Sequence, residues 1–302
     1  MIEQPKDKDV KAFIFFSVDI VDSSAYKSRF LNDWSKDFKL FLEAFPNKLN
    51  ESCKSVKIPR HEARPLPCPN IWKLVGDEVL FFIDISETYE KLQDKKELAY
   101  YELVLYYTIL FRRAIIVHNS AADEKLKKND RAFKIKGAAW FANIVKGPNY
   151  DELYGNIEIE FNNAKADGLK QRDFIGRQID IGFRIAKHST LNRFVISVEF
   201  AILLLRDNYL TIEDEGIELY YEGRKSIKGI LEYVDYPIIC IDMEDKFEHY
   251  ENDLLLRDVT PVNQINLMYF MEEYIKRTNF ILYYPFVHDN DRLFKYKPFR
   301  HL

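Results

Sequence analysis

The segment 12–19, AFIFFSVD, is almost entirely apolar and rich in aromatic and β-branched residues. A strand without alternation between polar and apolar residues is typical of a buried position, so this segment predicts a buried strand. A helix is expected next, over residues 25–48, because apolar residues recur there at helical spacing. Ser23 or Ser24 can cap that helix. The chain is therefore expected to begin with a strand and a helix.

Two apolar segments, 71–75 and 78–83, flank the dipeptide Gly76-Asp77. Two apolar runs around a two-residue turn predict a β-hairpin. The residues before it, 60–70, are rich in proline and predict a loop.

The same patterns predict the remaining elements. They are a helix over 88–118 broken near 94–96, a strand pair over 133–145, a short strand over 157–161, a helix over 173–188, a strand and short helix over 193–205, and strands over 219–221 and 231–241. The order β-α-β-β-α-β predicts an α+β fold, the ferredoxin-like palm. Residues 1–243 are expected to form this domain. Residues 244–302, polar and then aromatic, are expected to form a C-terminal extension that packs on the palm or on a dimer partner.

The charge balance of the chain limits its partners. Lys and Arg number 44, Asp and Glu 48, and the formal net charge is −4. Coating a nucleic acid needs an excess of cations, so no nucleic-acid partner is expected. A small anionic substrate in a local basic pocket remains compatible with this charge. With only 10 glycines, Gly-rich loops of the dinucleotide-binding type are not expected.

The cysteines and the apolar stretches bear on localisation. Cys53, Cys68 and Cys240 form no CxxC pair, which is typical of a reduced, intracellular protein. Residues 1–11 are polar and do not resemble a signal peptide. The most apolar stretches, 103–111 and 194–205, are too short to span a bilayer. A cytoplasmic protein without a membrane partner is therefore expected.

Two aspartates occupy the ends of predicted strands. Asp19 ends the first strand, and Asp77 lies at the tip of the hairpin, where Gly76 permits a tight turn. If these strands are neighbours in one sheet, both carboxylates meet at one edge. Two such oxygen donors can hold divalent ions that clamp a triphosphate. The alternative is that Asp77 is an ordinary turn residue, since Asp is common in turns.

Four motifs in order, over about residues 12–242, resemble those of the class III nucleotidyl cyclases, most closely the pyrimidine cyclases of the Pycsar anti-phage defence system. They are Asp19-Ile20 followed by Ser23-Ser24, Lys73-x-x-Gly76-Asp77, the run from Asp173 and Gly176 through Asp180 to Arg184, and Lys228-Gly229. The resemblance implies a cyclase homology domain with this palm.

The resemblance also implies residue roles at the metal and base sites. Asp19 and Asp77 would bind two Mn²⁺ (or Mg²⁺) ions, and Ile20 would lend a backbone carbonyl to one of them. Lys73 and Asp173 would read the base. Without the resemblance, Lys73 is equally an ordinary lysine at a strand edge.

The catalytic and phosphate-binding roles follow from the later motifs. Arg184 would stabilise the transition state, and Asp180 in the same helix stands where purine cyclases have Asn. Lys228 would hold the triphosphate. As alternatives, Arg184 could pair with Asp180 four residues earlier, and Lys228 could belong to a solvated loop.

The chain departs from the family in its residue 22 and in the strand around 137–141. Asp22 stands where the family usually has Gly. The strand around 137–141 lacks the Gly-Arg of many relatives, so one phosphate-binding arginine is missing. Trp140 and Phe141 are bulky there and suggest a narrowed pocket, which suits a pyrimidine.

The resemblance therefore implies a homodimer with shared active sites that converts UTP to 3′,5′-cyclic UMP and pyrophosphate as a signal in anti-phage defence. The donor of Lys73 and the acceptor of Asp173 match uracil, cytosine and adenine alike, so CTP and then ATP are the alternatives. A diguanylate-cyclase-like enzyme is disfavoured because Val75 and Val79 interrupt the Gly-Gly-Asp-Glu-Phe string. A non-catalytic nucleotide-binding palm is the remaining alternative.

Overall fold

The structure is a computed structural model that describes residues 10–55, 67–92, 100–145, 156–162, 170–205, 216–227, 235–243 and 262–278. The strands are β1 (Val10–Ile20), β2 (Asn70–Val75), β3 (Glu78–Asp84), β4 (Ile135–Val145), β5 (Asn156–Asn162), β6 (Lys170–Gly176), β7 (Arg193–Ile196), β8 (Leu219–Lys225) and β9 (Tyr236–Asp242). The helices are α1 (Ser23–Arg29), α2 (Trp34–Ser55), α3 (Ile85–Leu92), α4 (Tyr100–Lys127), α6 (Arg177–Ala186), α7 (Val198–Leu205) and α10 (Gln264–Thr278).

The described strands form one sheet in the order β2-β3-β1-β4-β7-β9-β8, and β5 and β6 form a ribbon beside β4. β1 lies between β3 and β4 and is antiparallel to both, and β2 is antiparallel to β3. With α1 and α2 before the hairpin and α3 and α4 after it, this is the βαββαβ arrangement. The predicted ferredoxin-like α+β fold is confirmed.

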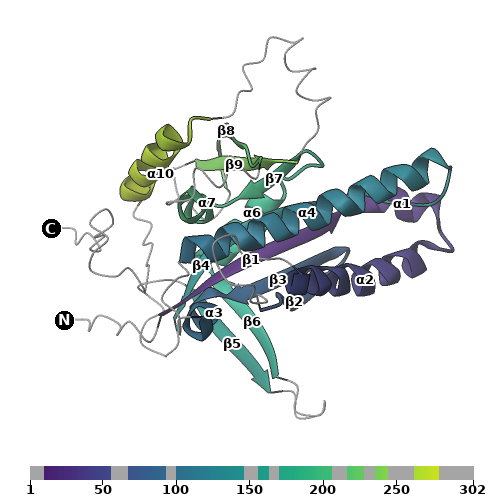
Figure 1. Cartoon of the computed structure of the whole chain (residues 1–302), viewed down its shortest axis with the longest axis horizontal. Helices are drawn as coiled ribbons and strands as arrows, with labels where there is room; N and C mark the ends of the chain where they lie inside the picture. Colours follow the sequence, from purple (N-terminus) through teal and green to yellow (C-terminus); the bar gives the residue numbers. More distant parts are fainter. Residues whose placement is uncertain are drawn as a thin grey trace, which may run out of the picture.

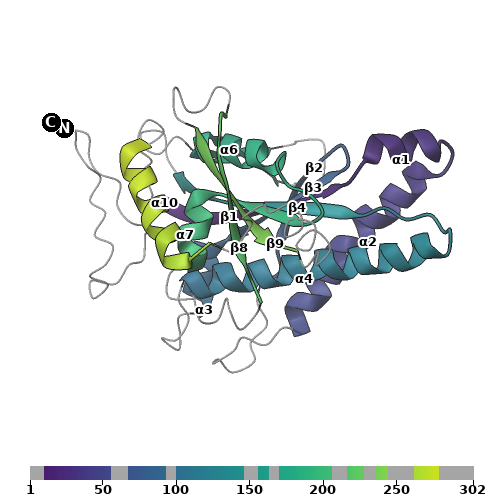
Figure 2. The same cartoon turned by 90° about the horizontal axis from the view of Figure 1, so that it is seen from above.

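Helices cover both faces of β1 and β4, as the apolar segment 12–19 requires. Seen from above, α4 and α6 lie on opposite sides of these strands (Figure 2). On one face the ring of Phe16 stacks on Phe111 of α4, with centroids 3.9 Å apart. On the other face Phe15 stacks on Trp140, with centroids 5.5 Å apart and planes at 9°. Alternate residues of the central strands therefore fill two separate layers of the core.

The second of these layers depends on a glycine in α6. A Cβ added at Gly182 would lie 2.2–2.4 Å from three atoms of the Trp140 ring system. We expect Gly182→Ala to lower the free energy of unfolding by about 1–3 kcal/mol, because the larger residue overpacks the core. Chemical denaturation measures this loss. Trp140→Leu supplies the control, since the alanine should cost less beside the smaller side chain. An equal cost in both backgrounds would contradict the packing described here.

The predicted helix over 25–48 is two helices. α1 ends at Arg29, and α2 starts at Trp34 and runs on to Ser55. The residue before α1 is Asp22, which has the left-handed φ of 52° and makes no side-chain capping bond. The predicted serine cap is therefore wrong. Glycine adopts such a left-handed backbone more readily than aspartate does.

Two later predictions also need correction. Residues 135–145 form one long strand, β4, rather than a strand pair. The predicted helix over 173–188 begins as a strand, β6, which pairs with β5 along its length. The chain changes from strand to helix at Gly176, whose φ of 139° favours glycine. Asp173 therefore lies on a strand and not at a helix start.

The ribbon of β5 and β6 projects from the body of the molecule (Figure 1). Its strand β5 pairs with β4, in parallel, at the residues Ile157 and Val145. The buried side-chain amides of Asn156 and Gln178, together with the backbone of Asn143, hold this junction. The Gln178 Oε1 atom accepts hydrogen bonds from Asn143 N and Asn156 Nδ2, both 2.8 Å long, and Gln178 N donates to Asn156 Oδ1 at 2.9 Å. This amide clamp fixes the start of the ribbon to β4 and α6.

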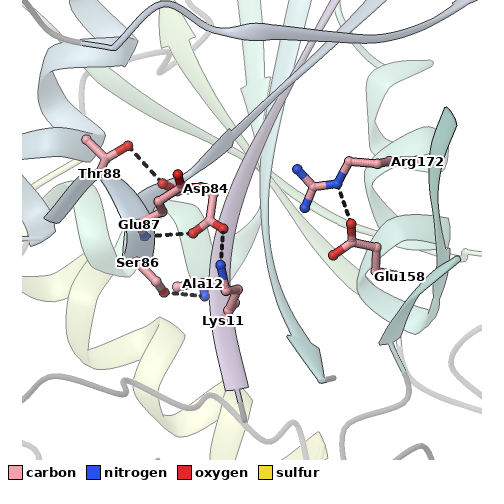
Figure 3. A network of polar contacts seen from close by, with 8 residues as sticks. All are labelled: Lys11, Ala12, Asp84, Ser86, Glu87, Thr88, Glu158 and Arg172. Atoms are coloured by element: carbon pink, nitrogen blue, oxygen red, sulfur yellow. Dashed lines mark hydrogen bonds and ion pairs between the residues drawn. The ribbon is translucent and has the colours of Figure 1, made fainter. Parts of the chain in front are cut away.

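A polar network anchors the start of β1, the end of the strand away from Asp19 (Figure 3). The Lys11 ammonium lies 2.8 Å from Asp84, whose other oxygen accepts the Glu87 N–H at the start of α3. Ser86 Oγ accepts the Ala12 N–H at 2.8 Å. On the ribbon, Arg172 of β6 pairs with Glu158 of β5. The contacts of Lys11 with Asp84 and of Ala12 with Ser86 tie α3 to β1, the strand that carries Asp19 at its far end.

The described part of the C-terminal extension is α10, which packs against the palm. Its residues Leu267, Met271 and Ile275 are buried, and Tyr274 lies edge-on to Tyr236 of β9. The division predicted at residue 243 stays a prediction. Most of the proline-rich segment, the break near 94–96 and Lys228 lie outside the described residues. Among the described helices, none carries an apolar stretch that could cross a membrane.

Candidate active site

Asp19 and Asp77 lie at the same end of the sheet. In the β1–β3 register, Asp19 is opposite Glu78, and Asp77 directly precedes Glu78 in the tight turn at Gly76. Both aspartate side chains are partly buried, at 31% and 23% exposure. Burial raises the pKa of Asp19, the Lys136 ammonium opposes this, and the Asp77 carboxylate raises it further. The two carboxylates are therefore close enough to interact, as the sequence predicts.

Glu78 is a third acid at this end of the sheet, and sequence reasoning missed it. Ser17 Oγ donates a hydrogen bond to its carboxylate. Burial raises the pKa of Glu78, and the carboxylates of Asp19 and Asp77 add to the rise. The sequence did carry a signal for it. Glu78 directly follows the turn residue Asp77, and this position places it opposite Asp19 in the β1–β3 pair.

The donors at this end of the sheet are of the kind that divalent ions bind. Across the residues with described positions, no group of three or more His, Cys, Asp and Glu side chains is arranged around one metal position. Of the three acids here, Asp19 and Asp77 are the candidate metal ligands, because the Glu78 carboxylate accepts the hydrogen bond of Ser17. Carboxylates, supplemented by a backbone carbonyl such as that of Ile20, suit hard cations such as Mg²⁺ and Mn²⁺. The residues present therefore fit the predicted metals.

Each of the two aspartates has a lysine beside it, which the sequence did not reveal. Lys136 of β4 is opposite Asp19 in the β1–β4 register, and its Nζ atom lies 3.5 Å from the Asp19 carboxylate. Lys27 of α1 places its Nζ atom 3.9 Å from the Asp77 carboxylate. This end of the sheet therefore combines paired acids with paired ammonium groups.

Lys73 and Asp173, 100 residues apart, meet across β2 and β6. Lys73 Nζ lies 2.8 Å from Asp173 Oδ1. The same oxygen accepts hydrogen bonds from Trp72 Nε1 and from the Phe174 N–H, both 2.9 Å long. Burial alone would raise the pKa of Asp173, but these hydrogen bonds and the Lys73 charge lower it overall. The pair presents an ionised acceptor beside an ammonium donor.

The rings beside this pair belong to Trp72 and Phe183. Lys73 Nζ lies 4.1 Å from the Trp72 ring centroid and 5.6 Å from that of Phe183. Trp140 and Phe141 are fully buried and point to opposite faces of β4. The prediction that they narrow an open pocket is therefore wrong, because both side chains belong to the core. Trp72 and Phe183 are the aromatic residues that contact the predicted base-reading lysine.

The remaining predicted site residues lie elsewhere or are not described. Asp180 is exposed in the first turn of α6, and Arg184 is partly buried in its last turn. Among the described residues, these two form no ion pair with each other. Lys228 lies outside the described residues. The role of Arg184 as a transition-state group stays a prediction.

Comparison of the sequence with protein families finds no match. Comparison with curated proteins finds none either. Among solved structures, this chain is similar to the adenylyl cyclase CyaB from P. aeruginosa, with 14% identity, a TM-score of 0.49, and coverage of 77% of this chain and 94% of that chain.

It is also similar to the guanylyl cyclase Cya2, with 12% identity, a TM-score of 0.43, and coverage of 78% and 92%. For the catalytic core of a rhodopsin-guanylyl cyclase in complex with ATPαS, the identity is 11%, the TM-score 0.45, and the coverage 77% and 96%. At these identities and scores the similarity assigns no activity to this chain.

Proposed function

We propose that this chain is a nucleotidyl cyclase that converts UTP to 3′,5′-cyclic UMP and pyrophosphate. The observation that carries the proposal is the meeting of Asp19 and Asp77 at one end of the sheet, together with the Lys73–Asp173 pair. The first pair can hold two divalent ions, and the second can recognise the edge of a base. Asp19 ends β1 and Asp77 lies in the turn between β2 and β3, whereas Lys73 lies on β2 and Asp173 on β6.

In this mechanism the ribose 3′-oxygen attacks the α-phosphorus in line, and pyrophosphate leaves. Asp19 and Asp77 would hold divalent ions, Mn²⁺ or Mg²⁺, which would supply Lewis acidity to the reaction. Arg184 would place positive charge near the α-phosphoryl oxygens, where negative charge develops. Lys228 would bind the triphosphate. No side-chain general base is required.

The proposed base preference rests on the Lys73–Asp173 pair and on the aromatic rings beside it. Lys73 donates and Asp173 accepts, a pattern that uracil, cytosine and adenine all match. Trp72 and Phe183 bring two large rings to this pair, which favours the smaller pyrimidines. UTP is therefore proposed as the substrate, with CTP and then ATP as alternatives. A signalling role in anti-phage defence, in the cytoplasm, belongs to the same proposal through the resemblance.

A homodimer with shared sites is also proposed. β2 ends the order of the described strands, and it exposes Ile71, Leu74 and Val75 to solvent. Ile175 of β6 is exposed as well. An apolar strand edge of this kind supports a contact with a second copy of the chain. The complete site would then combine the metal-binding aspartates of one protomer with the base-reading pair of the other.

The test is an assay of the purified protein with Mn²⁺ and each of the four nucleoside triphosphates. We expect cyclic UMP and pyrophosphate from UTP, resolved by chromatography and mass spectrometry. Formation of product from ATP alone would overturn the pyrimidine proposal and leave an adenylate cyclase. Binding of a nucleotide without any product would favour the non-catalytic palm.

A further inference from the structure

Each aspartate proposed to bind metal already has an ammonium group beside it. We propose that Lys27 and Lys136 are triphosphate ligands: they lie on Asp77 and Asp19 before metal and substrate bind, and they contact the phosphates afterwards. This inference rests on the proposed function and adds to it two phosphate-binding residues outside the motifs. The ligand class is a polyphosphate, either that of a nucleoside triphosphate or inorganic triphosphate.

Lys136 is placed by the sheet itself. The β1–β4 register sets it opposite Asp19, its side chain is only 22% exposed, and its ammonium lies 3.5 Å from the carboxylate. The Lys11–Asp84 pair at the other end of β1 is 2.8 Å long, and there Asp84 also caps α3 (Figure 3). The Lys11–Asp84 pair is therefore a short ion pair with a structural role. The longer Lys136–Asp19 separation leaves the ammonium able to turn to another anion.

Lys27 is placed by aromatic rings. Its Nζ atom lies 5.5 Å from the Trp34 ring centroid and 5.2 Å from that of Phe38, and 3.9 Å from Asp77. A lysine between two ring faces is held by cation–π attraction and by packing of its methylene stem. The rings therefore keep the Lys27 ammonium beside the turn that carries Asp77, even when that carboxylate is engaged elsewhere.

The charges at this end of the sheet explain why such lysines are useful. A divalent ion held by Asp19 or Asp77 would repel the adjacent ammonium, which could then contact a nearby anion. Two carboxylates and a nucleoside triphosphate carry more negative charge than two divalent ions balance, and two ammonium groups make up the difference. The β4 strand offers no arginine for this purpose, since its sequence is IKGAAWFANIV. Lys136 of that strand can instead supply one of the two balancing positive charges.

The experiment uses the full chain with Lys27→Met, Lys136→Met and the double substitution. Lys134→Met is the matched control, because Lys134 pairs with Asp123 at 2.8 Å. Mn²⁺ affinity without nucleotide is measured by electron paramagnetic resonance. In the presence of Mn²⁺, calorimetry measures binding of a UTP analogue with a methylene bridge between the α and β phosphorus atoms, and of inorganic triphosphate. Circular dichroism verifies the fold of each variant.

Opposite effects on the two ligands are expected. Loss of either lysine should raise Mn²⁺ affinity by roughly threefold, because a competing cation is removed. It should lower the affinity for the UTP analogue and for inorganic triphosphate by about tenfold, because a charged phosphate contact is lost. Lys134→Met should change neither affinity. If Lys27 and Lys136 had only a structural role, their loss would not raise Mn²⁺ affinity and lower phosphate affinity at the same time.

Two outcomes overturn the inference in distinguishable ways. Unchanged phosphate affinity in both variants, or a parallel loss of metal and phosphate binding, would remove the lysine assignment and leave the proposed function standing. A wild-type chain that binds neither Mn²⁺ nor the UTP analogue would instead overturn the proposed function itself. A loss confined to the UTP analogue, with inorganic triphosphate unaffected, would also contradict direct phosphate contact.

Discussion

Asp19→Ala and Asp77→Ala are each expected to abolish cyclic nucleotide formation. The structure places both carboxylates at one end of the sheet, and a single remaining carboxylate cannot hold two divalent ions against water. The fold should survive, because both side chains are partly exposed at strand ends. Turnover is measured with Mn²⁺ and UTP, and circular dichroism verifies folding.

A matched control for these variants is Asp123→Ala. Asp123 is also an aspartate paired with a lysine, Lys134, but it lies near the end of α4. Its loss should leave turnover close to that of the wild type. More than about a tenth of wild-type activity in either site variant would contradict the metal assignment, since such a loss corresponds to only ~1.4 kcal/mol of barrier.

Mixing two inactive variants is expected to restore activity. Asp77→Ala damages the metal-binding half of a site, and Arg184→Ala damages the proposed transition-state half. In a head-to-tail homodimer these halves come from different protomers, so a mixed dimer carries one intact site and one doubly damaged site. With random exchange, half of the dimers are mixed, and activity should recover to about one quarter of the wild type per chain.

The control for this experiment is proof of subunit exchange, for which a differently tagged protomer recovered with its partner is sufficient. Each variant assayed alone should remain inactive after the same treatment. Absence of recovery despite demonstrated exchange would mean that each site is built within one protomer. The exposed edge of β2 would then need another explanation.

The fold was predictable where local sequence decides structure. The segment 12–19 has no polar face, so it had to be a strand covered on both sides, and β1 is such a strand. The hairpin followed from Gly76-Asp77, because a two-residue turn fixes the register of its strands. With β1 beside β3, the meeting of Asp19 and Asp77 was predictable as well.

Predictions failed where distant segments decide structure. The periodicity that suggested a helix from 173 includes Ile175, which lies exposed on β6. β6 is a strand because β5 pairs with it, and helical periodicity in one segment does not reveal such pairing. In the same way, Trp140 looked like a pocket residue, although Phe15 and Gly182 enclose it from other elements.

The sequence motifs predicted which residues belong to the candidate site. They did not predict which other side chains contact those residues. Lys73 and Asp173 were expected to act together, and they meet. Trp72, which bonds the same carboxylate, carried no signal of its own because a tryptophan in a strand is ordinary core. Lys136 and Lys27 were missed because strand register and aromatic packing, rather than sequence spacing, place them beside the aspartates.

The amide clamp of Asn143, Asn156 and Gln178 has a consequence for how such a protein can diversify. The clamp fixes the root of the β5–β6 ribbon, while the metal-binding aspartates belong to β1 and the hairpin. Residues along the ribbon can therefore change without disturbing the strands that hold the aspartates. In the proposed enzyme, the Asp173 half of the base-reading pair could then vary on the ribbon, whereas the Lys73 half lies on the same hairpin as Asp77 and is constrained with it.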